Sequence, residues 1–288
     1  MKKKLAKIID GKKIAERISS EARREIVKLQ EAGKRMPGLA IVLIGEREDS
    51  KLYVKLKEKE ARKVGMNINV YRSSQEASEE DIIKTIEYLN QDDDVDAILV
   101  QLPLPEGLDT DRIIKAIDPE KDVDRFHPEN LKKLLETCSH EDVIPPVLQV
   151  VIEILEDIDF DLKDKKVCVV SNSDIFGKSL AKVLECRGGK IDLIQADDSE
   201  LKNKTIKADL LISAVGRPEF IGGDTIKENA VVIDIGITKE GDDILGDVNF
   251  KEAEEKVRFI TPVPGGVGPV TVAMLLKNTL TLYNRNMK

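Results

Sequence analysis

A lysine and a glutamine, Lys57 and Gln101, have side chains that could take part in acid–base chemistry. Lys57 follows Tyr53 by four residues, so both side chains share one face of a predicted helix. Gln101 directly follows Ala97 to Val100, an apolar run that predicts a buried strand. A lysine withdrawn from water has a lowered pKa and can act as an acid or a base near neutrality. The spacing alone does not single out Lys57, because a lysine among so many charged neighbours is usually solvated.

Two loops have the composition of ligand-binding segments. The polar loop from Lys121 to Pro128 carries carboxylates, such as Asp124, that suit the edge of an amino-pyrimidine; the alternative is a surface turn with ordinary ion pairs. Residues 261–269 hold three prolines and three glycines. Proline fixes φ, whereas glycine opens φ > 0 and lets another group approach the backbone. This stretch is therefore either a stiff strip for a planar or anionic ligand, or a tight connection.

The segment from Ser171 to Gly177 is a candidate phosphate-binding turn. It follows a predicted strand at 166–170 and precedes a helix that we expect to open near Gly177. In dinucleotide-binding folds, phosphate lies at the start of such a helix. Only one glycine remains where these turns usually carry three. A plain connection between strand and helix therefore stays open as the alternative.

Apolar runs alternate with polar, helix-like stretches along the chain, which is typical of parallel α/β sheets. Strands are predicted at 39–44, 68–71, 97–100, 166–170, 191–194, 210–214 and 231–235. A helix at 12–32 should cover the first sheet with its apolar face, and Ser50 should cap the helix that carries Lys57. A boundary near 142–145 separates the two series of elements.

The composition argues against several classes of protein. The 288 residues include 46 Lys and Arg against 54 Asp and Glu, so the net charge is −8, and nucleic acid is not expected as a partner. We see no signal peptide and no membrane span, and we expect a cytoplasmic protein. The three cysteines follow no metal spacing and are expected to be reduced. Because there are only two histidines, we expect no metal.

Several motifs occur together in the order and spacing of one family. They are Asp10-Gly11-Lys12, Ser50-x-x-Tyr53-Val54-x-x-Lys57, Gln101 to Pro105, Lys121 to Asp124, Val231 to Gly236, Gly246-Asp247-Val248 and Thr261 to Pro269. Over nearly its whole length, the chain resembles the methylenetetrahydrofolate dehydrogenase/methenyltetrahydrofolate cyclohydrolase family. The resemblance implies a three-layer α/β folate domain at 1–143, completed by a C-terminal helix at 268–288. It also implies a Rossmann-like dinucleotide-binding domain at 144–267, a cleft between the domains, and a homodimer joined through the nucleotide domains.

The resemblance also assigns roles to individual residues. It implies that Lys57 is the catalytic group for hydrolysis of the methenyl bridge, that Gln101 tunes its amine, and that Asp124 completes the catalytic set. Tyr53 would pack against the folate rings, and Asp124 would hold the pterin. The other residues implied to bind substrate are Pro264, Gly265 and Gly266, and those implied to bind the cofactor are Ser171, Asn172, Ser173, Gly177, Asp197 and Ile237. The partners implied are a folate and a dinucleotide, which is NADP by family expectation.

Departures from the family pattern concentrate in the dinucleotide half. Ser171 replaces the first glycine of the turn; we expect its side chain to weaken the turn, where φ > 0 is expected, so that Ser171→Gly tightens cofactor binding. Asp197 and Asp198 stand where relatives carry a Ser-Arg pair for the extra phosphate of NADP. Without an arginine to compensate, these carboxylates favour NAD. In the folate half, Arg125 replaces a glycine and should add bulk and charge beside the site.

Three functions follow from these patterns. The first is a bifunctional enzyme that oxidises methylenetetrahydrofolate with NAD(P) and hydrolyses the methenyl product to formyltetrahydrofolate. The second is a cyclohydrolase whose dehydrogenase activity is weak or lost. The third is a non-catalytic folate-binding paralogue, against which the intact Lys57 and Gln101 argue.

Overall fold

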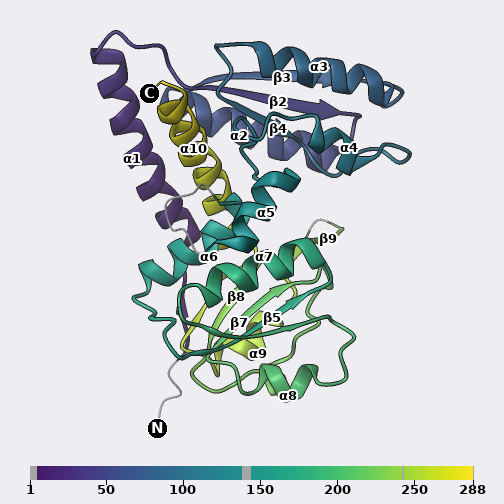
Figure 1. Ribbon diagram of the computed structural model, residues 1–288. Helices are drawn as coiled ribbons and strands as arrows, with labels where there is room; N and C mark the ends of the chain where they lie inside the picture. Colours follow the sequence, from purple (N-terminus) through teal and green to yellow (C-terminus); the bar gives the residue numbers. More distant parts are fainter. Residues whose placement is uncertain (1–4, 138–143, 242, 288) are drawn as a thin grey trace. The chain divides into compact units, whose positions relative to one another are not determined.

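The computed structural model describes residues 5–137, 144–241 and 243–287. These residues divide into two compact units (Figure 1). The first unit comprises residues 5–14, 134–137 and 147–271, and the second comprises residues 15–133, 144–146 and 272–287. The predicted domain boundary after residue 143 falls at the edge of segment 138–143, which lies outside the described residues.

The second unit is a three-layer α/β structure. Its parallel sheet has the order β3-β2-β4, with β2 (Gly38–Ile44), β3 (Asn67–Ser73) and β4 (Ala97–Val100). Alternate residues of β2 point to opposite faces of the sheet and belong to two separate hydrophobic cores. One core adds residues of α1 (Gly11–Glu31), α2 (Glu48–Val64) and α10 (Val267–Asn286); the other adds residues of α3 (Glu79–Gln91) and α4 (Thr110–Lys115). Burial on both faces explains why β2 is apolar throughout.

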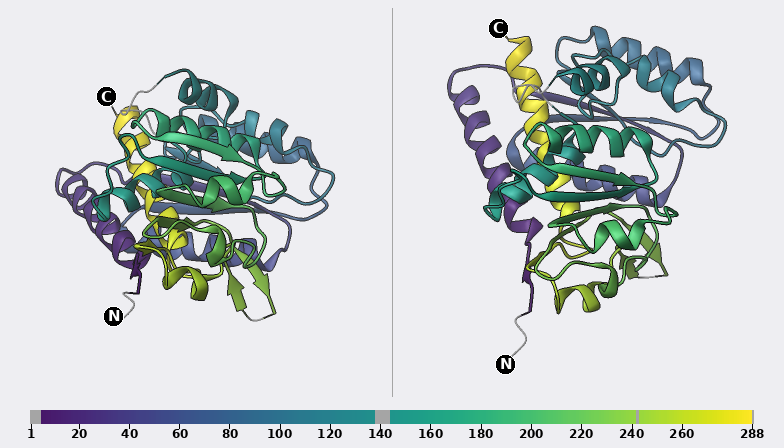
Figure 2. Two further views of the ribbon diagram at one scale, coloured as in Figure 1. Left: turned by 90° about the horizontal axis from the view of Figure 1, so that it is seen from below. Right: turned by 60° about the horizontal axis from the view of Figure 1, so that its bottom comes forward.

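The first unit is Rossmann-like, as predicted, with a six-stranded sheet whose described pairings are all parallel. Its order is β1-β11-β8-β7-β5-β6, with β1 (Lys7–Ile8), β5 (Lys166–Ser171), β6 (Lys190–Ile194), β7 (Leu210–Ala214), β8 (Val231–Asp234) and β11 (Phe259–Ile260). The chain runs from β5 to β6 on one side of β5 and then to β7 on its other side (Figure 2). Doubly wound sheets bind ligands at such a switch point.

The remaining elements connect these strands. They are α5 (Pro128–Glu136), α6 (Pro146–Asp157), α7 (Asp174–Glu185), α8 (Leu201–Thr205), α9 (Phe250–Glu254), the 3₁₀ helix η1 (Gly223–Thr225) and a hairpin of β9 (Thr238–Glu240) and β10 (Asp243–Leu245). The predicted strands lie within one or two residues of the observed ones.

Two helix starts differ from the sequence prediction. α2 begins at Glu48, so Ser50 lies in its first turn and is not its cap. α7 begins at Asp174, three residues before Gly177, because Ser173 Oγ accepts a hydrogen bond from the Phe176 N–H at 3.3 Å and caps the helix. Gly177 has a packing role, since a Cβ there would lie 2.8 Å from Leu193 Cδ1 on β6.

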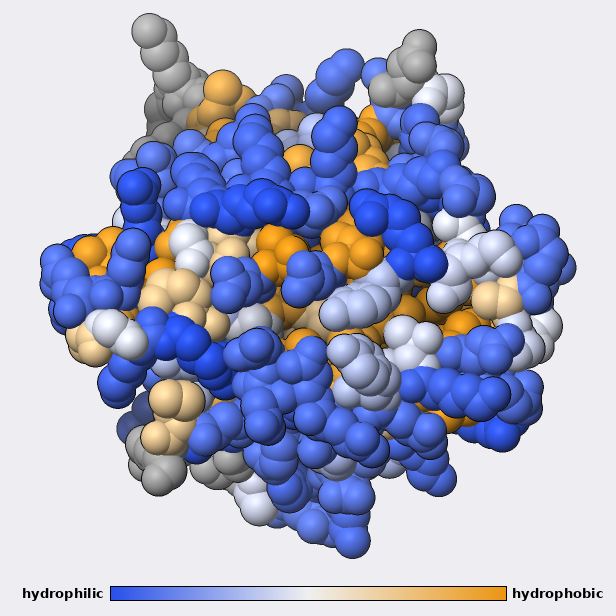
Figure 3. All heavy atoms as spheres, turned by 90° about the horizontal axis from the view of Figure 1, so that it is seen from above, coloured by the Kyte–Doolittle hydropathy of each residue, from blue (hydrophilic) through white to orange (hydrophobic). Residues whose placement is uncertain are grey.

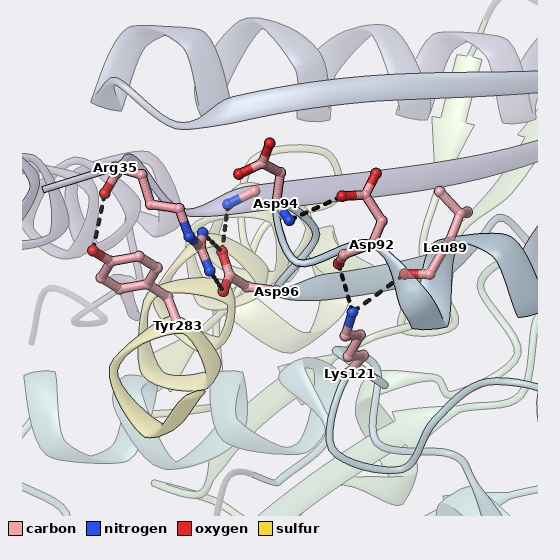
Figure 4. Close-up of polar contacts among 8 residues, drawn as sticks. Arg35, Leu89, Asp92, Asp94, Asp96, Lys121 and Tyr283 are labelled. Carbon is pink, nitrogen blue, oxygen red and sulfur yellow. Dashed lines mark hydrogen bonds and ion pairs between the residues drawn. The ribbon is translucent and has the colours of Figure 1, made fainter. Parts of the chain in front are cut away.

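A partly buried polar network links the C-terminal helix α10 to the sheet of the second unit (Figure 4). The Tyr283 hydroxyl donates to the Arg35 carbonyl oxygen at 2.9 Å, and the Arg35 guanidinium lies 5.0 Å from the Tyr283 ring centroid. Arg35 also donates two hydrogen bonds of 2.7 Å to Asp96, just before β4. Asp96 accepts a third from the Gly38 N–H, at the start of β2, at 2.8 Å. These contacts place α10 in the same core as β2 and β4.

Hydrophilic side chains cover most of the face in Figure 3, with hydrophobic residues gathered in a band between them. Among the described residues, no helix is long and apolar enough to cross a membrane. No group of three or more potential metal-binding side chains occurs within that part of the chain. Cys168 is a free thiol whose pKa burial raises to about 12. Cys186 is disulfide-bonded, so the expectation that all cysteines are reduced is wrong for this residue.

Candidate active site

Lys57 and Gln101 meet in the second unit, where β4 ends. Lys57 Nζ donates a hydrogen bond to Gln101 Oε1 at 2.9 Å, although the two residues are 44 positions apart. Gln101 Nε2 donates to the carbonyl oxygen of Leu102 at 2.7 Å. Because the amide nitrogen is engaged there, the amide oxygen faces the lysine. The pairing predicted from the resemblance is thus present in the fold.

The environment of Lys57 shifts its protonation equilibrium toward the neutral amine. Burial lowers the pKa of Lys57, and the Asp124 carboxylate opposes this shift. Tyr53, one helical turn earlier, is half-buried, and burial raises the pKa of its hydroxyl. The phenol therefore stays neutral near pH 7.

Asp124 is brought to this site by a segment that pairs with β4. The Ile98 N–H donates to the Lys121 carbonyl oxygen at 2.7 Å, and the Val123 N–H donates to the Ile98 carbonyl oxygen at 3.3 Å. Asn278 of α10 donates to the Val123 carbonyl oxygen at 3.3 Å. Burial raises the pKa of Asp124 to about 6, although the Lys57 ammonium acts in the opposite direction.

The loop that carries Asp124 is a buried structure and not a surface turn. Asp122, Arg125 and His127 are all buried. The Asp122 carboxylate accepts hydrogen bonds from the N–H groups of Arg125 at 3.0 Å and His127 at 2.8 Å, and from Asn130 Nδ2 at 3.0 Å. This carboxylate fixes the loop, a role that the sequence pattern did not reveal.

Arg125 follows Asp124 directly, and its side chain is buried. The residue is 4% exposed, and its guanidinium donates to the Pro119 carbonyl oxygen at 2.8 Å within the same loop. Its φ of 59° lies in the left-handed region, which glycine adopts more easily. That backbone angle accounts for the glycine expected at this position.

In the first unit, three of the predicted cofactor residues, Ser171, Ser173 and Asp197, line a cavity of about 440 Å³ at the switch point of the sheet. Its lining comes from the carboxyl ends of β5 and β6 and the start of α7: Ser171, Ser173, Asp174, Leu193, Ile194, Gln195, Asp197 and Asp198. Asn172 Oδ1 accepts from the Ala196 N–H at 3.1 Å and joins the two strand ends. The free N–H groups of the first turn of α7 suit an anionic ligand.

Ser171 shapes the turn after β5 without strain. Ser171 Oγ accepts from the Ser173 N–H at 3.1 Å and donates to the Ser173 carbonyl oxygen at 3.3 Å. Ser171 is not one of the described non-glycine residues with positive φ. The expectation of a strained backbone at Ser171 is therefore wrong.

Asp197 is paired with an arginine that lies outside its own stretch of sequence. Arg217 Nη1 and Nη2 donate to Asp197 Oδ1 and Oδ2 at 2.7 and 3.0 Å. The expectation that no arginine compensates this carboxylate is wrong. Arg217 lies 20 residues further along the chain, after β7, where no local pattern links it to Asp197.

Two buried carboxylates organise the neighbouring loops of the first unit. Asp247 accepts from Ser213 Oγ at 2.7 Å and from the N–H groups of residues 215, 216 and 217 at 2.7, 2.9 and 3.0 Å. Asp234 accepts from the N–H groups of Gly236, Asp247 and Val248 at 3.0, 3.1 and 2.8 Å. Burial raises the pKa of Asp234 to about 7, against the effect of these donors. Ile237, a predicted cofactor residue, follows this turn and is 46% exposed.

The predicted substrate residues Pro264, Gly265 and Gly266 belong to the first unit, where their loop packs against the start of α1. A Cβ on Gly11 would lie 1.7 Å from the Gly266 carbonyl oxygen, so two distant motifs meet backbone to backbone. Gly265 has a φ of 106°, and Pro264 is exposed. Glycine is therefore required by close approach at Gly11 and by backbone angle at Gly265.

Comparison with known proteins agrees with this arrangement. Residues 9–124 match the model of the tetrahydrofolate dehydrogenase/cyclohydrolase catalytic domain, and residues 145–287 match that of the NAD(P)-binding domain. The chain belongs to the tetrahydrofolate dehydrogenase/cyclohydrolase family.

Relatives in this family match nearly end to end. The bifunctional protein FolD of Aquifex aeolicus is 43% identical over 282 residues, which cover 98% of this chain and 96% of that protein. The FolD structure from Campylobacter jejuni is 35% identical with a TM-score of 0.93, covering 97% of this chain and 99% of the other. The Trypanosoma brucei structure, described as a complex with NADP cofactor and inhibitor, is 33% identical with a TM-score of 0.94, covering 99% of each chain.

Proposed function

We propose that this protein oxidises methylenetetrahydrofolate with a nicotinamide dinucleotide and hydrolyses the methenyl product to formyltetrahydrofolate. The observation that carries the proposal is the 2.9 Å contact of Lys57 Nζ with Gln101 Oε1, in surroundings that lower the pKa of the lysine. Family membership supports the same reaction pair.

Lys57 would act as the proton carrier in hydrolysis. Water adds to the electrophilic methenyl carbon and must lose a proton, which a neutral amine can accept. The resulting tetrahedral carbon then breaks one of its two C–N bonds, and the departing nitrogen takes a proton back. Gln101 orients the amine, because its own amide is fixed by the Leu102 carbonyl oxygen.

The remaining folate contacts follow from the chemistry of the side chains. The Asp124 carboxylate would accept hydrogen bonds from the amino-pyrimidine edge of the pterin, and Tyr53 would stack on the folate rings. Pro264, Gly265 and Gly266 are proposed as further substrate contacts. These residues support a folate domain at 1–143 with helix 268–288, and a nucleotide domain at 144–267.

The cavity in the first unit has the chemistry to hold a dinucleotide. Ser171, Asn172 and Ser173 lead into the start of α7, where N–H groups suit a pyrophosphate, and Gly177 allows close packing of that helix. Ile237 lies at the turn after β8. When bound, the dinucleotide supplies the hydride acceptor. We propose NAD as the preferred form, because Asp197 can accept hydrogen bonds from ribose hydroxyls and would repel a 2′-phosphate.

A cyclohydrolase with weak dehydrogenase activity is the second candidate. The observation that favours it is Ser171, whose side chain occupies the turn that would receive the pyrophosphate. Lys57, Gln101 and Asp124 would be unaffected by such a loss.

We also propose a homodimer joined through the first unit. β6 lies at the edge of its sheet and pairs only with β5 among the described strands. Its unpaired backbone groups and the partly exposed Leu193 offer a surface for a second copy. The cytoplasmic location remains a prediction from the sequence.

Two assays test the proposed function. Loss of methenyl absorbance measures hydrolysis, and formation of reduced cofactor from methylenetetrahydrofolate measures oxidation with NAD or NADP. We expect both activities, with a higher kcat/KM for NAD. Hydrolysis without oxidation would favour the second candidate, and folate binding without either reaction would support a non-catalytic paralogue.

A further inference from the structure

Arg217 and Asp197 form a two-pronged ion pair at the edge of the cavity in the first unit. The two hydrogen bonds, at 2.7 and 3.0 Å, align a guanidinium with a carboxylate that lines the cavity. Both side chains remain accessible, since 43% of the arginine and 79% of the aspartate side chain are exposed. A ligand in the cavity therefore meets Asp197, and the Arg217 guanidinium beside it is accessible from solvent.

The position of Arg217 does not depend on Asp197 alone. The N–H groups of Val215, Gly216 and Arg217 all donate to the Asp247 carboxylate, which is fully buried. The guanidinium carbon also lies 5.4 Å from the centroid of the Phe220 ring. A rigid turn and an aromatic face thus hold the arginine near the ends of β5 and β6. Removing the Asp197 carboxylate would leave the guanidinium in place and without this partner.

Guanidinium groups bind phosphates by the same two-pronged geometry that they use for carboxylates. In a dinucleotide-binding fold, the acidic residue after the second strand faces the 2′ position of the adenosine ribose. Asp197 follows β6, which comes directly after β5 and is the second strand of the proposed nucleotide domain at 144–267. A 2′-phosphate would therefore approach the Asp197 carboxylate, which is already hydrogen-bonded to the Arg217 guanidinium.

We propose that Arg217 is a specificity-determining residue for the cofactor. Its guanidinium has the geometry to bind the 2′-phosphate of NADP, and its ion pair with Asp197 prevents this. The inference rests on the proposed dinucleotide site and deepens it. While Asp197 is present, Arg217 holds the carboxylate in place as an acceptor for ribose hydroxyls. Once that carboxylate is removed, the same guanidinium binds a 2′-phosphate.

Four proteins test the inference: the wild type, Asp197→Asn, Arg217→Gln and the double variant. Calorimetry with adenosine 2′,5′-bisphosphate and adenosine 5′-monophosphate isolates the 2′-phosphate, because the two probes differ in that group alone. We expect Asp197→Asn to raise the affinity ratio of bisphosphate to monophosphate by about 10-fold or more, as for a gained charge-assisted hydrogen bond. When Asp197→Asn is added to Arg217→Gln, the substitution relieves only the repulsion of the phosphate. The affinity ratio of bisphosphate to monophosphate should then rise by roughly threefold or less.

An equal rise in both backgrounds would overturn the inference, because relief of repulsion would then explain the whole effect. No rise in either background would overturn it as well, as would failure of both probes to bind the wild type. Asp224→Asn is the matched control, since it breaks the exposed Lys202–Asp224 ion pair of 2.5 Å in the same unit and should leave the ratio unchanged.

Turnover with NAD and NADP is measured on the same four proteins. Absence of methylenetetrahydrofolate oxidation with either cofactor would contradict the proposed function. The role of Arg217 is decided separately, by the affinity ratio of the probes, which requires no turnover.

Discussion

Lys57 can carry protons near neutrality only if its charged and neutral forms are close in free energy. Burial disfavours the ammonium, whereas the Asp124 carboxylate stabilises it, and the net pKa of Lys57 is lowered. Gln101 adds a neutral acceptor at 2.9 Å that holds the amine in one orientation. Both groups therefore act on the Lys57 amine, Asp124 through its charge and Gln101 through its hydrogen bond.

Replacing Lys57 with methionine should abolish this proton carrier while keeping the length and apolar packing of the side chain. We expect Lys57→Met to slow methenyl hydrolysis by roughly 10²-fold or more, with folate affinity largely retained. Gln101→Ala should have a milder effect, through the orientation of the amine. Hydrolysis is followed by methenyl absorbance and folate binding by calorimetry.

Lys63→Met, at an exposed position of the same helix, is the control and should hydrolyse at the wild-type rate. Near-normal hydrolysis by Lys57→Met would remove this lysine from the mechanism and favour the non-catalytic paralogue.

Asp124 should make folate binding depend on pH. Its pKa of about 6 means that the carboxylate is ionised at pH 7 and becomes protonated as the pH falls below 6. A protonated carboxyl loses acceptor capacity for the pterin edge, so we expect the Kd of a folate ligand to rise by up to about tenfold per pH unit below 6. Asp124→Asn should bind more weakly at pH 7 and show a flatter profile between pH 5 and 7. An unchanged profile in that variant would assign the pH dependence to another group.

At the scale of elements, the Arg35–Asp96–Tyr283 network explains how the last helix, α10, packs against the sheet of the second unit. Asp96 is 0% exposed, whereas the Arg35 side chain keeps 29% of its surface accessible. Asn278 of the same helix donates a hydrogen bond to the Val123 carbonyl oxygen, next to Asp124. The packing of α10 and the shape of the candidate site are therefore connected.

Asp96→Asn should lower the free energy of unfolding by about 2–3 kcal/mol, because it leaves Arg35 without its carboxylate and removes one acceptor of the Gly38 N–H. The partial exposure of Arg35 lets water hydrate its charge, which keeps the cost below that of a fully buried pair. Tyr283→Phe should cost about 1 kcal/mol, the value of one hydrogen bond. Urea unfolding measures both.

The neighbouring exposed Asp94→Asn is the control and should change stability by less than about 0.5 kcal/mol. A cost for Asp96→Asn as small as that of the control would mean that the ion pair contributes little to docking of α10.

The sequence predicts elements better than it predicts the contacts between them. Periodicity located the strands, because burial on both faces of a parallel sheet leaves continuous apolar runs. It misplaced the start of α7, where the cap at Ser173 prevails over the flexibility of Gly177. Pairing of Arg217 with Asp197 depends on two loops that the sheet topology brings together. No local pattern carries that information, and the same holds for the backbone contact of Gly11 with Gly266.

At the scale of the whole molecule, the two proposed chemistries rest on separate cores. The described cluster of the first unit draws on β5, β7, β8 and α9, whereas those of the second unit draw on β2, β4 and the helices packed against them. Residues without shared contacts change free energies additively, within about 0.3–0.5 kcal/mol. Lys57 belongs to the second unit and Asp197 to the first.

We therefore expect the double variant Lys57→Met/Asp197→Asn to combine the two single effects without interaction. Its hydrolysis rate should equal that of Lys57→Met within roughly twofold, and its affinity ratio for the two adenosine probes should equal that of Asp197→Asn within the same margin. Both quantities are measured on all three variants under one set of conditions. A departure of about tenfold in either quantity would instead reveal a coupling free energy near 1.4 kcal/mol between positions 57 and 197, and would contradict the independence of the two cores.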